Sequence, residues 1–379
     1  MVKVAELKIT SVEVIPLRLP VKYVLKVATG EYPFLEPVLI KVHTNQGVTG
    51  IGEVECYPGY DRIGPEPPKG VVQLLEESLA PLIIGENPFD IERIYQKMNQ
   101  AVQGHVWVKA GLDIALWDLM GRALDIPSYY LLGGAVRRRA QVEGVGYGIP
   151  MVEPEKVAKM AKEAVSRGYT ELELKVGDEN PSRDVERLRL TREAVGPEPS
   201  IKLDFNKGYD AKTAISIIQE MERYGIQWVE QPVDYWDLEG MVRIRQMVKT
   251  PLIADECVNT AHEMMLVAKM GAADAIHIKP AVKGGLTEAK RIEFVASAAG
   301  MFIIAGTMVP TGVGMGAVHT FLASLRHVHR GIHGSPLDLL ADDIVKDPIP
   351  EGSPTVEISD KPGLGFELDE EKVAKYRVG

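Results

Sequence analysis

The sequence predicts an α/β protein in which an α+β N-terminal domain, which we call the capping domain, is joined to a (β/α) barrel of the TIM type, and three observations support this. From about residue 139 onward, short apolar runs alternate with amphipathic helical stretches, as in parallel strands joined by crossover helices. Seven such repeats, followed by a weak strand near residues 331–335, favour a closed barrel over an open sheet. Residues 1–130 instead begin with strand-like alternation and continue with helical periodicity, which predicts a separate domain.

The capping domain is expected to contain an antiparallel sheet, two long loops and a helical part. Asn45-Gln46-Gly47 separates two alternating runs and predicts a hairpin turn, because glycine readily supplies a positive φ. Loops are expected at about Val21–Pro37 and Tyr57–Gly70, and loops of this length are often functional lids. Apolar residues at three- and four-residue steps then predict helices up to about residue 124.

Residues 131–330 are expected to form the barrel, and residues 331–379 a tail. The predicted strands are QVEGVGYG, TELELKVG, SIKLDFN, IQWVEQP, PLIADE, DAIHIKP and MFIIAGT. Several of the helical stretches between them end in glycine, which readily adopts the left-handed conformation that closes a helix. The tail is rich in turns and is expected to pack back on the capping domain rather than extend the barrel.

The composition excludes several function classes. The balance of 43 basic against 53 acidic residues gives a net charge of −10, and no basic stripe is long enough to indicate nucleic-acid binding. No apolar run is long enough to cross a bilayer, and residues 1–10 do not resemble a signal peptide. Cys56 and Cys257 lie far apart without metal-ligand spacing, which suits a reducing cytoplasm. We therefore expect a cytoplasmic protein without nucleic-acid or membrane partners.

Three of the predicted strands end in an acidic residue, namely Asp204 in LDFN, Glu230 in VEQP and Asp255 in ADE. Each acid follows the previous one by one strand–helix unit, so the carboxylates are expected to meet at the C-terminal rim of the barrel, where such barrels place their active sites. Oxygen ligands without a neighbouring histidine or cysteine favour Mg²⁺ or Mn²⁺ over Zn²⁺. The alternative for each acid alone is that it caps the following helix or pairs with a neighbouring base.

Lysines end the strands on either side of these acids. Lys175 in LKVG precedes the acids and Lys279 in KPAVKGG follows them, so the two ammonium groups would face each other across the barrel. With a metal between them they form two opposed proton carriers, which indicates an enzyme that removes a proton next to a carboxylate. The alternative for either lysine alone is a solvated or ion-paired side chain. Lys283 is taken as a surface residue, and His277 as a histidine of the core or of the surroundings of the site.

The chain resembles the enolase superfamily, specifically its muconate lactonizing enzyme subgroup. The resemblance covers nearly the whole chain and rests on AGLDIALWDLMGRALDIPSYYLLGG, LKVG, LDFN, VEQP, ADE, KPAVKGGL, AGTM, DDIVKDPIP and KPGLGFELDEE. It implies an α+β capping domain over a (β/α)7β barrel, with Mg²⁺ held by Asp204, Glu230 and Asp255. It further implies that Lys175 and Lys279 are an acid/base pair acting through an enediolate. It also implies N-terminal loops that close over the substrate and select it, and a homo-oligomer, often an octamer.

The sequence departs from this family in the motif around the first lysine. The usual KxK motif is Glu173-Leu174-Lys175 here, so an acid stands where a lysine is usual, and Glu173 would raise the pKa of Lys175. Lys202 precedes Asp204 by the same two positions on the next strand. We therefore predict an ion pair between Glu173 and Lys202 inside the barrel.

Two further departures concern the reaction. Dipeptide epimerases place a DxD pair at the eighth strand, where this chain has Ile332-His333-Gly334, and the acid of the muconate enzymes is missing from the same stretch. This argues against a dipeptide epimerase and weakens the case for a muconate cycloisomerase proper. The seventh strand ends in Ala305-Gly306-Thr307 without a histidine, which argues against the sugar-acid dehydratases that use a His–Asp dyad.

The expected reaction is abstraction of the α-proton of a small carboxylic acid, followed by racemisation, epimerisation or cycloisomerisation. Asn206, Glu256 and Thr307 stand at the same strand ends and are expected to bind substrate or to support the site. Syn-dehydration by a lyase is the alternative within the subgroup. A Schiff-base aldolase using one of the lysines, or a relative without activity kept as a binding protein, are the alternatives outside it.

Overall fold

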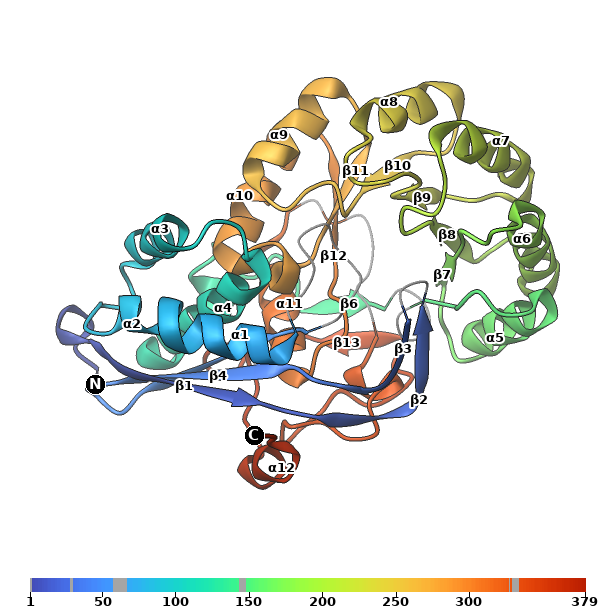
Figure 1. The fold of residues 1–379 in the computed structure, drawn as a ribbon. Coiled ribbons are helices and arrows are strands. Elements are labelled where there is room, and N and C mark those ends of the chain that lie inside the picture. Colours follow the sequence, from blue (N-terminus) through green and yellow to red (C-terminus); the bar gives the residue numbers. More distant parts are fainter. Residues whose placement is uncertain (1, 28–29, 57–66, 143–147, 327, 329–333) are drawn as a thin grey trace.

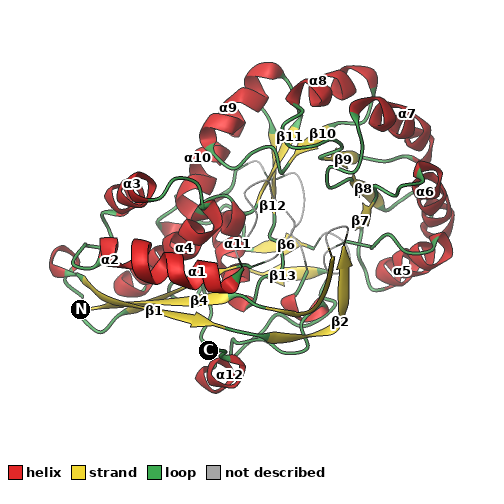
Figure 2. Cartoon of the chain, viewed as in Figure 1, coloured by secondary structure: helices red, strands yellow, loops and turns green. Residues whose placement is uncertain are grey.

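The computed structural model describes residues 2–27, 30–56, 67–142, 148–326, 328 and 334–379 (Figure 1). A curved parallel sheet carries helices on its outer side, and an antiparallel sheet with its own helices lies against one side of it (Figure 2). The predicted α/β class, with a capping domain and a TIM-like barrel, is confirmed.

The capping domain is built on the antiparallel sheet β1-β4-β5. Its strands are β1 (Ile9–Pro16), β4 (Val38–Thr44) and β5 (Thr49–Val54). Gly47, with φ of +76°, lies in the turn between β4 and β5, so the predicted hairpin is confirmed. Only glycine adopts this conformation without steric cost, which is why the turn could be read from the sequence.

The loop predicted at about Val21–Pro37 is wrong, because this stretch forms a second hairpin. Strands β2 (Leu19–Val27) and β3 (Gly30–Leu35) pair antiparallel. A proline at position 20 and a shift of register after it interrupt the regular alternation, which conceals these strands in the sequence. Within the second predicted loop, residues 57–66 lie outside the described residues, and residues 68–70 already belong to the first helix.

Helices cover one face of the capping sheet, and the longest of them lies directly on β5. They are α1 (Pro68–Leu74), η2 (Leu75–Leu79), α2 (Ala80–Ile83), α3 (Ile91–Ala101) and α4 (Val106–Leu124). A Cβ atom on Gly50 would lie 2.2 Å from the carbonyl oxygen of Ala115, and one on Gly52 would lie 2.1 Å from that of Gly111. Glycines in the strand thus permit the close approach of sheet and helix.

The parallel sheet has the strand order β12-β11-β10-β9-β8-β7. Its strands are β7 (Glu171–Lys175), β8 (Ser200–Asp204), β9 (Trp228–Glu230), β10 (Leu252–Ala254), β11 (Ala275–Ile278) and β12 (Phe302–Ala305). They confirm six of the seven predicted strands. Single bridges between Ile149 and Leu174 and between Ile303 and Val328 continue the sheet at its two edges.

The remaining predicted strands are only partly described. Of the first, QVEGVGYG, Gln141 belongs to β6 (Arg139–Gln141), which pairs with the tail instead of the barrel sheet. Residues 143–147 lie outside the described residues. Most of the weak strand predicted near 331–335 also lies outside them.

Helices follow the barrel strands and lie on the outside of the sheet (Figure 1). They are α5 (Pro154–Ser166), α6 (Pro181–Val195), α7 (Ala211–Met221), α8 (Leu238–Met247), α9 (Ala261–Met270), α10 (Gly285–Ala298) and α11 (Gly312–Ser324). Short turns of helix are η1 (Val4–Glu6), η3 (Ser128–Tyr130), η4 (Glu222–Tyr224), η5 (Pro280–Val282) and η6 (Pro336–Asp338). Polar side chains cap the N-termini of several helices. At the start of α7, for example, Asp210 accepts hydrogen bonds from the backbone N–H groups of Lys212 and Thr213.

The C-terminal segment contacts the capping domain. Lys41 forms an ion pair of 2.7 Å with Glu370 of α12 (Glu370–Tyr376), and the backbone N–H of Val378 donates to the carbonyl of Pro16. The tail also contacts the start of the barrel, because β13 (Thr355–Glu357) pairs with β6. Among the helices of the described segments, none combines the length and the apolar character needed to cross a membrane.

Candidate active site

The three predicted acids lie at the carboxyl ends of neighbouring strands and are all buried. Asp204 of β8 stands opposite Glu230 of β9, and Glu230 stands opposite Ile253 of β10, two positions before Asp255. Residues two apart on a strand share a face, so the strand register brings all three acids to the same end of the sheet. This is the carboxyl-terminal end, where α/β barrels place reactive groups.

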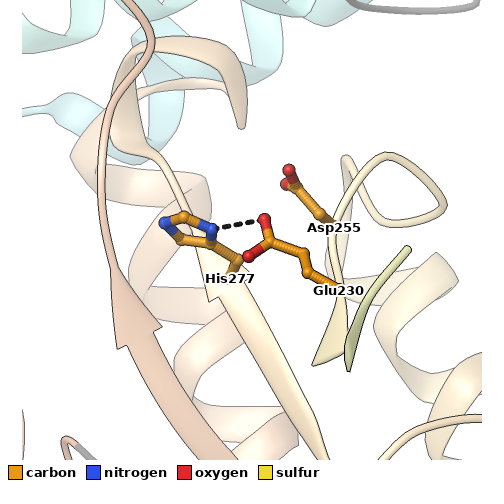
Figure 3. A group of neighbouring side chains, drawn as sticks. All are labelled: Glu230, Asp255 and His277. Atoms are coloured by element: carbon orange, nitrogen blue, oxygen red, sulfur yellow. Dashed lines mark hydrogen bonds and ion pairs between the residues drawn. The ribbon is translucent and has the colours of Figure 1, made fainter. Parts of the chain in front are cut away.

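Two of these acids and a histidine form a compact group of possible metal ligands. Glu230, Asp255 and His277 each offer one ligand atom, and these atoms all lie within 4.8 Å of one another (Figure 3). His277 Nδ1 lies 2.8 Å from Glu230 Oε1. From the sequence, His277 was expected in the core or in the surroundings of the site, and nothing indicated that the imidazole would lie among the ligands. The third predicted acid, Asp204, holds the ammonium group of Lys175.

Burial and neighbouring cations set the charges of these groups. Burial raises the pKa of Glu230, but Lys202 and His277 outweigh it and bring this pKa to about 2. Burial likewise opposes ionisation of Asp255, yet Lys279 and Lys283 hold its pKa well below the ordinary value. Burial also lowers the pKa of His277 to about 4 despite the nearby Glu230, so the imidazole is neutral at neutral pH.

Both predicted lysines lie beside the acids. Lys175 Nζ is 2.6 Å from Asp204 Oδ2, and Lys279 Nζ is 2.5 Å from Asp255 Oδ2. Burial would lower the pKa of Lys175, but Asp204 and then Glu173 outweigh it and raise this pKa, as predicted for Glu173. The pKa of Lys279 is raised in the same way, because Asp255 and other acids offset its burial. In this arrangement both amines therefore carry a proton.

Lys283 is not a surface residue, so that prediction was wrong. Its side chain is fully buried, and Nζ donates to the carbonyl oxygen of Asp255 at 2.7 Å and lies 3.2 Å from Asp255 Oδ1. The chain turns sharply after η5 through Gly284 and Gly285, both of which have positive φ. This turn directs Lys283 under the strand ends, and no periodic pattern in the sequence marks it.

The predicted ion pair between Glu173 and Lys202 is confirmed. The two residues stand opposite each other on β7 and β8, and Lys202 Nζ lies 2.8 Å from Glu173 Oε2. Lys202 Nζ also lies 2.8 Å from Glu230 Oε2, and Glu173 Oε1 lies 2.5 Å from Lys175 Nζ. A line of alternating charges therefore connects Lys175 to Glu230 through the barrel.

The three residues expected to support the site lie around its rim. Asn206 has φ of +39°, and its side chain donates to Glu256 Oε1 at 3.4 Å. Glu256 is buried, and burial together with Asp255 and Asp204 raises its pKa to about 8. Thr307 is buried and donates to Glu55 Oε1 at 2.8 Å, so it connects the barrel to the capping domain.

Two buried acids at the end of β5 hold the segment between β12 and α11, and no pattern in the sequence indicates this. Glu55 accepts hydrogen bonds from the Thr307 hydroxyl and from the N–H of Val309. Glu53 accepts from the hydroxyl and N–H of Thr311 at the start of α11. Finding these contacts requires the packing of two domains, which no local pattern encodes. We name Glu53 and Glu55 the capping-domain acids.

The capping-domain acids predict a dependence of stability on pH. Burial raises the pKa of Glu53 to about 7 and that of Glu55 to about 8, against the hydrogen bonds that lower both. The folded protein then keeps protons that the unfolded chain releases above a pH of about 4.5, so this contribution to stability falls as the pH rises towards 8. We expect a lower thermal midpoint at pH 8.5 than at pH 5.5, with a smaller difference for Glu55→Gln. A surface change such as Glu357→Gln should leave the difference unaltered, and an equal difference in Glu55→Gln would contradict this assignment.

The group around Glu230 fits a divalent metal ion. Two carboxylates and a neutral imidazole are all ligand types that such ions accept, and the imidazole of His277 departs from the set of oxygen ligands expected from the sequence. Lysine ammonium groups balance the charge of the two acids. Glu256 follows Asp255 in the chain; its Oε2 is buried, and no described residue donates a hydrogen bond to this oxygen. Ile332 and His333, which stand where dipeptide epimerases carry a DxD pair, lie outside the described residues.

Comparison with known proteins agrees with this geometry. Family models match residues 7–133 (mandelate racemase / muconate lactonizing enzyme, N-terminal domain) and residues 156–372 (enolase C-terminal domain-like). The N-succinyl-L-Arg/Lys racemase of Bacillus cereus is 30% identical over 98% of each chain. A hydrophobic dipeptide epimerase of Enterococcus faecalis is 32% identical, over 95% of this chain and 99% of the relative. A chloromuconate cycloisomerase of Cupriavidus pinatubonensis is 30% identical, over 89% of this chain and 90% of the relative.

The same relationship holds in three dimensions. The crystal structure of the Bacillus cereus racemase superposes with a TM-score of 0.91 at 29% identity, covering 98% of each chain. The named relatives are a racemase, an epimerase and a cycloisomerase, which are all isomerases.

Proposed function

Because the chain belongs to the mandelate racemase and muconate lactonizing enzyme family, we propose that it is an isomerase that removes and returns the α-proton of a small carboxylate. Racemisation or epimerisation is the reaction that the arrangement of its residues supports best. Lys175 would serve one face of the substrate carbon and Lys279 the other, each as the base in one direction and the acid in the reverse direction.

The observation that carries this proposal is the position of the two lysines at opposite ends of the row of acids. Lys175 ends β7 and contacts Asp204, whereas Lys279 follows β11 and contacts Asp255, and three strands lie between β7 and β11. In a curved sheet the ammonium groups of such strands approach a common space from different sides. A proton can then leave one face of the carbon and return to the opposite face, which inverts the centre.

We propose Mg²⁺, or Mn²⁺ in its place, as the metal, with Asp204, Glu230 and Asp255 as its ligands and His277 beside them. When bound, the cation would stabilise the negative charge that develops on the substrate carboxylate. Asp204 and Asp255 would then serve as metal ligands as well as partners of Lys175 and Lys279, and the positive charge nearby would favour the neutral amine that a base requires. Asn206, Glu256 and Thr307 would orient the substrate and the ligands at the rim.

The proposed substrates are amino acids acylated on nitrogen. Two of the named relatives act on compounds of this kind, an N-succinyl amino acid and a hydrophobic dipeptide. The second candidate reaction is cycloisomerisation, because another relative is a chloromuconate cycloisomerase at similar identity. The named relatives give no support to a lyase, and the paired acids give none to a Schiff-base aldolase.

Hydrogen exchange in D₂O tests the proposal. We expect the α-hydrogen NMR signal of at least one N-succinyl or N-acetyl amino acid to disappear in the presence of Mg²⁺, together with inversion of the centre. A chelator should stop the exchange, and added Mg²⁺ should restore it. Turnover of cis,cis-muconate alone would establish the second candidate. Activity that resists chelators and is trapped by borohydride would contradict the proposal in favour of an aldolase.

The remaining proposals concern location and assembly. We propose a cytoplasmic homo-oligomer, an octamer or smaller, without membrane or nucleic-acid partners, with boundaries between capping domain, barrel and tail near residues 130 and 330. Phe294, Met265 and Leu266 are 74%, 54% and 49% exposed on α10 and α9, and a second copy would cover such apolar side chains. Cys56 and Cys257 are both free and buried, which agrees with a reducing compartment.

A further inference from the structure

We propose that Glu173, anchored by Lys202, is a positioning residue for Lys175 and therefore controls proton transfer on only one face of the substrate. This inference rests on the proposed function. The contacts of Glu173 carry it, together with the glycine that closes over them.

The ammonium group of Lys175 is held between two carboxylates from different strands. Glu173 Oε1 lies 2.5 Å from Lys175 Nζ, and Asp204 Oδ2 lies 2.6 Å from the same atom. Glu173 precedes Lys175 by two positions on β7, so both side chains project into the barrel from one face. A lysine has a long and flexible side chain, and two fixed contacts restrict it to one position.

Glu173 is itself fixed by a buried cation. Its second oxygen lies 2.8 Å from Lys202 Nζ, and Lys202 is fully buried with its other contact on Glu230 Oε2. Glu173 is also fully buried. A carboxylate held on both oxygens in a closed site keeps its rotamer, so it can act as a rigid guide for the neighbouring amine.

The backbone at Gly148, before β7, lies close to the contact between Glu173 and Lys175. A Cβ atom on Gly148 would lie 2.7 Å from Glu173 Oε1 and 3.1 Å from Lys175 Cε. Gly148 has φ of +93°, a conformation that side chains other than hydrogen rarely adopt. Glycine at this position therefore allows the chain to close directly over the contact between Glu173 and Lys175, which leaves the two side chains no room to part on that side.

The effect of Glu173 should be confined to one lysine. Three strands separate β7 from β11, and Lys279 is held by Asp255 at the far side of the row. If Glu173 guides Lys175, its loss should slow proton transfer at the face that Lys175 serves and spare the other face. A merely structural role would slow both faces together.

The experiment compares Glu173→Gln with the wild-type protein in the Mg²⁺-loaded state. Glutamine keeps the shape of the side chain but loses the charge that attracts the amine. Exchange of the α-hydrogen with D₂O is measured for each enantiomer separately, and the enantiomer that Lys175 serves is defined as the one that Lys279→Ala still exchanges.

We expect Glu173→Gln to slow exchange of the enantiomer that Lys175 serves roughly tenfold to hundredfold, because misplacing a reacting group by about 1 Å can cost about a hundredfold in rate. Exchange of the other enantiomer should change less than about threefold, and the surface control Glu357→Gln should change neither.

Equal slowing of both enantiomers, or no slowing of either, would overturn the inference. A crystal structure of Glu173→Gln provides a readout that does not depend on activity. We expect Lys175 Nζ to leave its place between residue 173 and Asp204, and an unchanged Lys175 would also overturn the inference. If the wild-type protein exchanges none of the compounds, the proposed function has failed, whereas the crystal structure still decides whether Glu173 positions Lys175.

Discussion

Lys279→Ala is expected to abolish inversion of the substrate centre while leaving α-hydrogen exchange of one enantiomer in place. General acid–base catalysis by one side chain contributes about 10²–10⁴-fold to a rate, so racemisation should fall by about that factor. Lys175 remains beside its acids in this variant, and it can still remove a proton from its own face and return a deuteron to the same face. Lys175→Ala should show the reciprocal pattern, with exchange of the opposite enantiomer only.

The measurement is NMR of each pure enantiomer in D₂O, combined with polarimetry for inversion. Lys159→Ala is a suitable control, because this lysine lies on the exposed side of α5 with a side chain that is 77% exposed. Loss of exchange for both enantiomers in one lysine variant, with normal exchange in the other, would point to a single base and a different role for the second lysine. Full racemisation by Lys279→Ala would contradict the two-base mechanism.

Lys202→Met is expected to destabilise the protein by about 3–5 kcal/mol, because removing one partner of a buried ion pair leaves uncompensated charge. Lys202 Nζ lies 2.8 Å from Glu173 and 2.8 Å from Glu230, and methionine would remove the cation that these two carboxylates share, although Lys175 would still contact Glu173. The thermal midpoint should fall by on the order of 10 °C.

The double variant Glu173→Gln/Lys202→Met provides the matched comparison. It removes one of the two acids together with the cation, so it should be more stable than Lys202→Met alone. Thermal unfolding with a chelator and with Mg²⁺ checks both expectations. A midpoint within about 2 °C of the wild type for Lys202→Met would show that the buried cation contributes little to stability.

Much of the arrangement of acids and lysines in the active site could be predicted because the geometry of strands is regular. Alternation of side chains and the regular spacing of strand–helix units place acids and lysines at one end of the sheet. The pair Glu173–Lys202 follows from the same rules, since equal offsets from the strand ends become opposite positions in the register. Six strands of the parallel sheet were identified for this reason.

The features that escaped prediction depend on irregular backbone or on contacts between domains. Lys283 is buried because two glycines with positive φ turn the chain inward after η5, and the hairpin β2–β3 is masked by Pro20 and a register shift. The approach of His277 to Glu230 depends on side-chain conformations from strands that are not adjacent. Glu53 and Glu55 act across a domain boundary that has no local signature.

The capping-domain acids also limit how this enzyme can be engineered. Glu53 and Glu55 satisfy backbone donors at the start of a barrel helix, so the N-terminal third is a structural part of the barrel and not an exchangeable module. A chimera that takes this region from a relative to alter selectivity would have to carry matching acceptors on the transplanted strand. Without them, several buried N–H groups beside Thr307 would be left unsatisfied, at a cost of about 1–3 kcal/mol each.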